Sequence, residues 1–287
     1  MLELDLPRVT LHDGGPTPVR EHAPGLWLKD DGAFGSGGWG GNKVRKLEWL
    51  LGRAAAEGRR RILTFGGRGT NWGLATALYG REHGIDTVLA LVDQPDTPHV
   101  REQFARIRRS GATVVLTRDK RRTAARLPWL WLRHGRPWIL PAGGSTPLGA
   151  VGYVAAAQEI AGQVRAGALP EPDRVVVAVG TGGTLAGLTV GLQAAGLRTR
   201  PYGVVVNDQL RLDHRRIERL AKRCAELVGA DVDPGAFALT RDFLGAGYGH
   251  PLPGADPAFD PVYTGKAMAA ARQLDGTTLF LQTDGPR

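Results

Sequence analysis

The chain has 287 residues, 42% hydrophobic and 23% charged, which suits one large domain or two ordinary ones and excludes disordered and collagen-like architectures. Its 41 glycines exceed the usual share of ~7% and indicate many tight turns and close approaches of the backbone to a ligand. The net charge of +9 raises the question of nucleic acid, but the basic clusters at 59–61, 118–122 and 215–223 are short and not interleaved with aromatic residues. We therefore expect solvated surface, or sites for small phosphorylated ligands, and no nucleic-acid partner.

The cysteine content and the N-terminal segment bear on location. A single cysteine, Cys224, excludes an intrachain disulfide and a cysteine-based metal site, and it fits a reducing compartment. The N-terminal residues lack the basic and then apolar pattern of a signal peptide, and no stretch approaches the roughly 18 apolar residues of a membrane span. We therefore expect a cytoplasmic protein with no metal and no membrane partner.

Short β-branched runs, glycine-bearing turns and amphipathic stretches alternate along most of the chain, a pattern typical of parallel α/β sheets. The first forty residues hold strand-like stretches at 8–11 and 26–29. A first set then predicts strands at 61–65, 87–92, 112–116 and 138–140 and helices at 72–82, 99–109 and from 118 onward. After a break at 143–147, a second set predicts strands at 174–179, 202–206 and 278–281 and helices at 149–165, 183–195, 211–228 and 265–273.

These two sets predict an α/β protein of two domains, each an open and mostly parallel sheet flanked by helices. The smaller domain spans residues 53–142. The larger domain combines residues 1–52 with residues 143–287, because the first forty residues have no helix of their own to complete a domain.

A glycine-rich segment at 35–41 leads into a helix whose apolar positions between 44 and 51 repeat with helical spacing. Lys43 and Lys46 therefore fall in its first turn, at the positive end of the helix dipole, where cations are disfavoured. An anion beside the helix start would explain them, and so would a lysine whose pKa is lowered for imine formation. The plain alternative is an ordinary surface helix start.

A second glycine turn, at 180–184, follows the apolar run at 174–179 and opens a helix. Backbone N–H groups freed by the glycines, together with the helix N-terminus, form a seat for a phosphate, and two threonines add hydroxyl donors. Leu185 occupies the third glycine position of the dinucleotide fingerprint, so a single phosphate fits better than a pyrophosphate. A tight connection with no ligand is the alternative.

A third glycine loop, at 65–72, again joins a strand to a helix. Its Asn71 either caps the helix or points its amide into the crevice. The loop by itself does not decide between these interpretations.

The segment Gly-Gly-Asn-Lys-Val-Arg-Lys-Leu-Glu at 40–48 resembles the cofactor-lysine segment of the pyridoxal-phosphate enzymes of the tryptophan synthase β fold, or fold type II. Within them the chain resembles the branch that contains 1-aminocyclopropane-1-carboxylate deaminase and D-cysteine desulfhydrase. The similarity continues in order through residues 16–18, 29–31, 66–71, 143–145, 180–184, 263–266 and 282–285. It implies pyridoxal 5'-phosphate in the crevice between the two domains, a small amino-acid substrate and a homodimer.

The resemblance also implies roles for single residues. Lys43 would form the Schiff base with the cofactor aldehyde and move the substrate α-proton, Asn71 would bind the pyridine hydroxyl, and Thr283 would face the pyridine nitrogen. The implied cofactor-binding residues are Lys43, Lys46, Asn71, Gly180, Thr181, Gly182, Gly183, Thr184, Tyr263, Thr264 and Thr283. The implied catalytic residues are Lys43, Thr70, Tyr248 and Tyr263.

Departures from the family pattern concern the substrate side. Thr264 stands where the cyclopropane deaminases carry glutamate and the desulfhydrases carry threonine, and Gly69 and Thr70 stand where glutamine and serine are usual. Asp284 replaces the first glycine of a usual Thr-Gly-Gly. A hydroxyl such as that of Thr283 does not keep the pyridine nitrogen protonated as a carboxylate does, which favours elimination.

We therefore expect a pyridoxal-phosphate lyase or deaminase that performs D-cysteine desulfhydrase-like α,β-elimination on a small amino acid. One alternative is β-replacement or another amino-acid conversion on the same scaffold. A second is 1-aminocyclopropane-1-carboxylate deamination. Outside the enzymes, the alternative is a protein that only binds the cofactor or another phosphoanion.

Overall fold

The computed structural model describes residues 2–35 and 40–285, which form two compact units of α/β type. Unit 1 contains the residues up to Asp5, Thr10–Lys46 and Ser145–Arg287, and unit 2 contains Leu6–Val9 and Leu47–Gly144. The division therefore falls after Lys46, within helix α1 (Asn42–Ala56), whereas the sequence analysis placed it after residue 52. Residues 36–39 of the predicted glycine-rich segment lie outside the described residues.

Unit 1 is built on a six-stranded sheet in the order β1-β2-β10-β7-β8-β9. All neighbouring strands in it run parallel except β1, which is antiparallel to β2. Val175, Val176 and Val177 are fully buried, as expected for a parallel strand covered on both faces. The strands are β1 (Val19–Ala23), β2 (Leu26–Asp30), β7 (Arg174–Val179), β8 (Arg200–Val205), β9 (Ala238–Thr240) and β10 (Thr278–Gln282).

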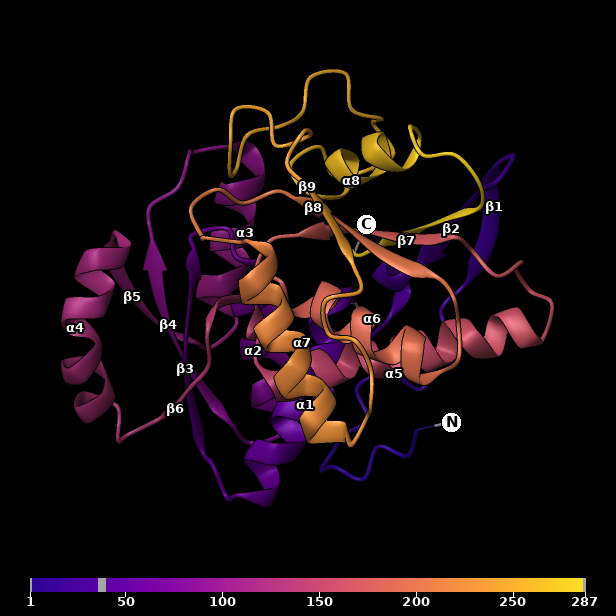
Figure 1. Cartoon of the computed structure of the whole chain (residues 1–287). Helices are drawn as coiled ribbons and strands as arrows, with labels where there is room; N and C mark the ends of the chain where they lie inside the picture. Colours follow the sequence, from indigo (N-terminus) through magenta and orange to yellow (C-terminus); the bar gives the residue numbers. More distant parts are fainter. Residues whose placement is uncertain (1, 36–39, 286–287) are drawn as a thin grey trace. The chain divides into compact units, whose positions relative to one another are not determined.

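Helices cover both faces of this sheet, with α8 on one side and α5 and α6 on the other (Figure 1). Met268 of α8 packs with Val176 and Phe280 in one apolar cluster. On the other side α5 and α6 approach closely, since a Cβ added at Gly187 would collide with the carbonyl oxygen of Ala150. The helices are the short η1 (Asp31–Ala33), α5 (Pro147–Arg165), α6 (Gly183–Ala194), α7 (His214–Val228) and α8 (Thr264–Ala271).

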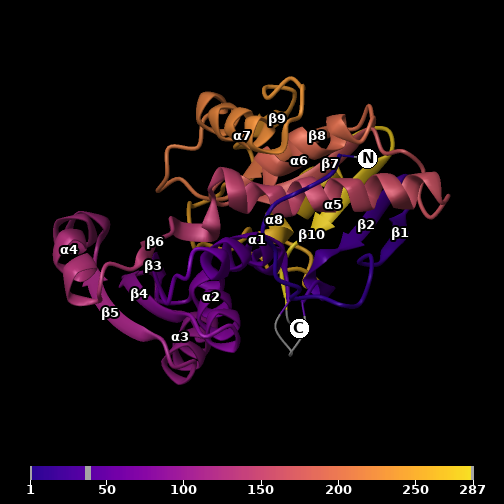
Figure 2. The ribbon, with the colours of Figure 1, turned by 90° about the horizontal axis from the view of Figure 1, so that it is seen from below.

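Unit 2 holds a four-stranded parallel sheet in the order β5-β4-β3-β6. Helix α4 lies on one face and helices α2 and α3 lie on the other (Figure 2). Leu130 of α4 joins Leu63, Val88 and Ala90 of the strands in an apolar cluster. The elements are β3 (Arg61–Gly67), α2 (Asn71–Glu82), β4 (Asp86–Val92), α3 (Pro98–Arg109), β5 (Thr113–Arg118), α4 (Lys120–Arg133), β6 (Trp138–Ile139) and the short η2 (Ala142–Gly144).

The alternation predicted from residue 60 onward is confirmed, but the strand predicted at 8–11 is wrong. Val9 N donates instead to the carbonyl oxygen of Glu48 in α1 (3.0 Å), so this apolar stretch packs along a helix. Two edge strands, β1 and β9, were missed, because β1 is short and its middle residues are polar and β9 has three residues. No helix among the described residues is long and apolar enough to span a membrane.

Candidate active site

Two lysines in the first turn of α1 are withdrawn from water. The Lys46 side chain is 1% exposed and Lys43 is partly buried. Burial lowers the pKa of Lys43 to about 8, although the Asp284 carboxylate acts in the opposite direction. Burial, and then the charge of Lys43, lower the pKa of Lys46 well below the usual range. The first turn holds no acidic residue, so the two amines favour an anion beside them.

The glycine turn after β7 lies beside Lys46. A Cβ added at Gly183 would stand 3.1 Å from Lys46 Nζ and 2.7 Å from Ser145 Oγ. Gly183 N donates to Ser145 Oγ (3.2 Å), and Ser145 Oγ lies 2.6 Å from Thr181 Oγ1. The Lys46 amine, two hydroxyls and the start of α6 thus lie close together around Gly183, where an added methyl group would collide with them. This arrangement is the one expected of a phosphate seat.

The turn is shaped by its own residues. Gly182 precedes α6 with φ +93°, a left-handed conformation that glycine adopts without strain. Asn207 Nδ2 donates to the carbonyl oxygen of Gly180 (2.9 Å), and Thr184 is buried in the first turn of α6. The structure therefore brings together Lys46 and the predicted residues Gly180, Thr181, Gly182, Gly183 and Thr184.

Ser145 was missed as a site residue. The sequence analysis used positions 143–145 only for the resemblance. The Ser145 hydroxyl contacts the turn at 180–184, although Ser145 lies 36 positions before Thr181 in the chain. A contact between residues so far apart in sequence is not visible in a local pattern. A serine directly after two glycines and before a predicted helix was the available signal.

Two predicted tyrosines face each other. Tyr263 Oη donates to Tyr248 Oη (3.3 Å), and the rings meet edge to face with centroids 6.1 Å apart. Burial raises the pKa of Tyr263 well above the usual range, and the charges of Asp260 and Asp284 add to the rise. Asp284 thus acts electrostatically on both Lys43 and Tyr263, a relationship the sequence did not indicate.

The side-chain amine of Lys266 holds the loop that carries Tyr248. Lys266 Nζ donates to the carbonyl oxygens of Leu244 (2.7 Å) and Gly247 (3.3 Å). Lys266 is fully buried, so these bonds fix the loop at the point where it presents Tyr248. The buried amine of Lys266 therefore has a structural role, since it holds the loop through these two carbonyl oxygens.

The end of β10 meets the start of α1. The carbonyl oxygen of Thr283 accepts a hydrogen bond from Asn42 N (3.3 Å), and a Cβ at Gly41 would lie 3.0 Å from that oxygen. Thr264, at the start of α8, is 1% exposed, and its Oγ1 has no hydrogen-bond partner among residues 2–35 and 40–285. A buried hydroxyl of this kind is free to meet a polar group of a ligand.

The remaining predicted residues, Thr70 and Asn71, belong to unit 2. Thr70 is the N-cap of α2, where its Oγ1 accepts from Gly73 N (3.1 Å). The interpretation of Asn71 as the cap is therefore wrong. Asn71 is the first helical residue, and its Oδ1 accepts a hydrogen bond from Gln103 Nε2.

The residues of unit 1 fit pyridoxal phosphate. The turn at 180–184 with Lys46 and Ser145 suits its phosphate, Lys43 supplies an amine of lowered pKa, and the hydroxyl of Thr264 lacks a partner. Fold and site together define an α/β protein in which a glycine turn at the carboxyl end of a parallel strand, with Lys46 beside it, is suited to a phosphate. Lys43, three residues before Lys46, has a lowered pKa.

Comparison with known proteins agrees with this class. Residues 10–253 match the family described as "Pyridoxal-phosphate dependent enzyme", and the chain belongs to that family. A Pyrococcus horikoshii protein with the provisional name 1-aminocyclopropane-1-carboxylate deaminase is 32% identical over 295 residues, covering 94% of this chain and 87% of the relative. The D-cysteine desulfhydrase of Yersinia enterocolitica is 32% identical over 274 residues, covering 86% of this chain and 82% of the relative. The crystal structure of an ACC deaminase homologue superposes with a TM-score of 0.82 at 30% identity, covering 97% of this chain and 92% of that one.

The family confirms the predicted cofactor, pyridoxal 5'-phosphate. The fold prediction of parallel-dominated sheets flanked by helices is likewise confirmed. The relatives confirm the predicted enzyme class, a pyridoxal-phosphate-dependent lyase or deaminase.

Proposed function

We propose that this enzyme carries out α,β-elimination on a small amino acid with a leaving group on its β-carbon, as in D-cysteine desulfhydration. The observation that carries the proposal is the pair of amines in α1: buried Lys46 beside Gly183, and partly buried Lys43 with a pKa of about 8. Thr264 favours elimination over ring opening, because the desulfhydrase branch that the chain resembles carries threonine there.

Different residues of the chain bind the cofactor and move the proton. Lys46, Ser145 and the turn at 180–184 hold the phosphate, and Lys43 binds the cofactor covalently through Nζ. When bound, pyridoxal phosphate withdraws electrons from the substrate α-carbon and makes its C–H bond acidic. Once the substrate amino group has taken the place of Lys43 on the cofactor, the released Lys43 amine, neutral above about pH 8, would remove the α-proton, and the β substituent would depart with its electron pair.

The tyrosine pair acts at the leaving group. Tyr263 Oη donates to Tyr248 Oη, so a proton can pass along this bond toward a departing thiolate. We propose that Tyr248, which the resemblance implies to be a catalytic residue, supplies that proton. For D-cysteine the balanced reaction consumes water and releases pyruvate, hydrogen sulfide and ammonia.

A turnover comparison tests the reaction. The holoenzyme is given D-cysteine, L-cysteine, β-chloroalanine and 1-aminocyclopropane-1-carboxylate, and keto acid and ammonia are quantified. Pyruvate from the first three, with little 2-oxobutanoate from the cyclopropane substrate, is the expected result. Faster 2-oxobutanoate release would show ring-opening deamination instead, and a substituted amino acid formed with added thiol would show β-replacement.

A homodimer and a cytoplasmic location also form part of the proposal. The resemblance supports the first, and the single buried cysteine, Cys224 of α7, supports a reducing compartment for the second. Light scattering coupled to gel filtration measures the mass of the assembly, and a result of one chain per particle would contradict the homodimer.

A further inference from the structure

Unit 2 contains a cavity that takes no part in the chemistry above. It has a volume of about 720 Å³, within the ~300–1,000 Å³ of small-molecule sites, and it opens where β3, β4 and β5 end. Arg68 follows β3, Asp93 follows β4, and Arg118 is the last residue of β5. Ligands of open parallel sheets bind at this edge, beyond the carboxyl ends of the strands.

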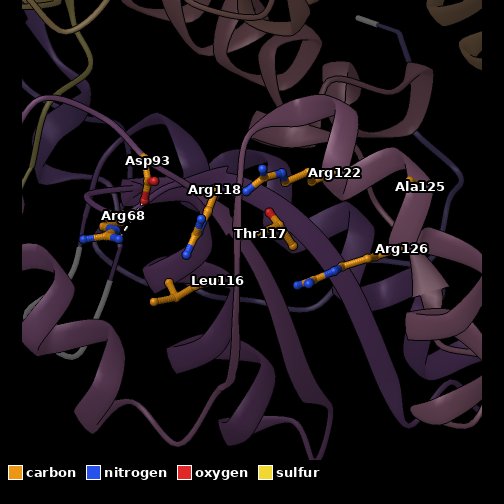
Figure 3. A pocket seen from close by; sticks show the side chains of 8 residues that line it. All are labelled: Arg68, Asp93, Leu116, Thr117, Arg118, Arg122, Ala125 and Arg126. Carbon is orange, nitrogen blue, oxygen red and sulfur yellow. Dashed lines mark ion pairs between the residues drawn. The ribbon is translucent and has the colours of Figure 1, made fainter.

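The charge in the cavity is strongly unbalanced. Arg122 and Arg126 project from α4 toward Arg118, and Arg68 lies on the far side beside Asp93 (Figure 3). Asp93 is the one carboxylate of the lining, and it pairs with Arg68 at 2.7 Å. Within residues 2–35 and 40–285, Arg118 and Arg126 have no ion-pair partner, and Arg122 meets only Asp119 at 3.4 Å. Guanidinium groups gathered without counter-charge favour a bound anion.

The backbone directs Arg118 into this space. The ladder between β4 and β5 is shifted there, so that Leu91 pairs with Leu116 and Val92 with Arg118. Thr117, the extra residue, turns inward and donates to the carbonyl oxygen of Leu91 (3.2 Å). Bulges of this kind re-aim side chains near functional sites. Arg118 itself has φ +66°, a conformation that is costly for a residue with a side chain.

Helix α4 adds to the positive field. Its first turn holds Lys120, Arg121 and Arg122 and no acidic residue, although the N-terminus of a helix is already positive. The Asp119 N-cap offsets only part of this charge. Leu116, 43% exposed, and Ala125 supply the apolar part of the lining.

We propose that this cavity binds a small molecule carrying at least two phosphate groups, of the nucleoside diphosphate or triphosphate class. Guanidinium groups match phosphate oxygens bidentately, and the arginines that approach from β5 and α4 can hold neighbouring phosphates. The apolar side chain of Leu116 then lies beside a less polar part of the ligand. The site belongs to unit 2, whereas the phosphate seat at 180–184 belongs to unit 1.

Calorimetric titration of the holoenzyme with pyrophosphate, ADP and ATP tests the proposal. Saturation with pyridoxal phosphate fills the seat in unit 1. A binding stoichiometry of one nucleotide or pyrophosphate per chain then reports the cavity of unit 2. Arg118→Gln with Arg126→Gln should weaken binding at least about tenfold, since each removes a charge-assisted contact. Arg108→Gln with Arg109→Gln, exposed on α3, makes the same change in net charge and should leave binding within about twofold.

Substitutions to glycine separate binding from folding. Arg118→Gly relieves the left-handed backbone and should raise the Tm while it weakens ADP binding. Arg136→Gly, at φ +57° outside the cavity, should raise the Tm and leave binding unchanged. Equal loss of binding in the Arg108/Arg109 control, no heat with millimolar ligand, or tighter binding of a single-stranded RNA oligonucleotide than of ATP would each overturn the proposal.

Discussion

The guanidinium of Arg45 donates two parallel hydrogen bonds to the carboxylate of Asp31, Nε to Oδ2 at 2.9 Å and Nη2 to Oδ1 at 2.7 Å, and both side chains are buried. Glu159 binds the third nitrogen of Arg45 at 3.0 Å, and Tyr153 donates to Asp31 Oδ2. Arg45 lies between Lys43 and Lys46 on α1. This ion cluster therefore anchors the turn that presents both amines.

Breaking this pair should destabilise the protein strongly. Asp31→Asn leaves Arg45 with its charge only partly compensated in the interior, which costs about 3–5 kcal/mol when a buried partner is lost. Urea unfolding of the variant measures the free energy. Asp86→Asn, which removes an exposed partner of Arg61, should cost less than about 1 kcal/mol, and a similar loss in both variants would contradict the role of the buried cluster.

Lys43 should carry the cofactor. Lys43→Ala is expected to lose the visible absorption band of lysine-bound pyridoxal phosphate and essentially all turnover, because no other side chain then forms the covalent link. Lys222→Ala, on an exposed position of α7, is the matched control and should keep both. Borohydride reduction followed by peptide mapping identifies the linked lysine, and a label on any other lysine refutes the assignment.

The rate at which the apoenzyme takes up pyridoxal phosphate should depend on pH with a midpoint near 8. Only a neutral amine attacks the aldehyde, and burial lowers the pKa of Lys43 to about 8, so the rate rises with pH and levels off above this value. Asp284→Asn removes a charge that raises this pKa, and the midpoint should therefore move to lower pH. Asp231→Asn, at an exposed position, should leave it in place, and an unshifted midpoint in the Asp284 variant would count against the electrostatic coupling.

Gly183→Ala should weaken cofactor binding far more than folding. Its Cβ would stand 2.7 Å from Ser145 Oγ and 3.1 Å from Lys46 Nζ, inside the proposed phosphate seat. Equilibrium dialysis measures the cofactor affinity, and we expect a loss of more than tenfold. Gly162→Ala on α5 meets nothing within 4 Å and should keep the affinity while stabilising the helix by up to ~1 kcal/mol.

Tyr248→Phe should lower turnover about 10² to 10⁴-fold while the visible spectrum of the holoenzyme stays unchanged, since general acid–base groups contribute on this scale. The variant keeps the ring that packs edge to face with Tyr263 and loses only the hydroxyl. Steady-state kinetics with β-chloroalanine, whose chloride needs no proton to leave, should show a much smaller loss than kinetics with D-cysteine. Equal losses with both substrates would contradict proton donation by Tyr248.

The sequence by itself determined those features that short segments carry. The alternation of β-branched runs and amphipathic stretches predicted the parallel sheets, since periodicity is read over a few neighbouring residues. The segment at 40–48 and the turn at 180–184 predicted a cofactor lysine and a phosphate seat, because each motif has its residues close together in the chain.

Only the tertiary structure decided the features that join distant segments. Ser145 meets Thr181, Arg45 meets Asp31 and Glu159, and three strand ends gather the arginines of unit 2. The stretch at 8–11, which looked like a strand, packs along α1 instead. The lowered pKa values of Lys43 and Lys46 likewise follow mainly from burial in the folded chain. Desolvation and charge pairing depend on which atoms surround a group in space, and a local pattern of residues does not contain that information.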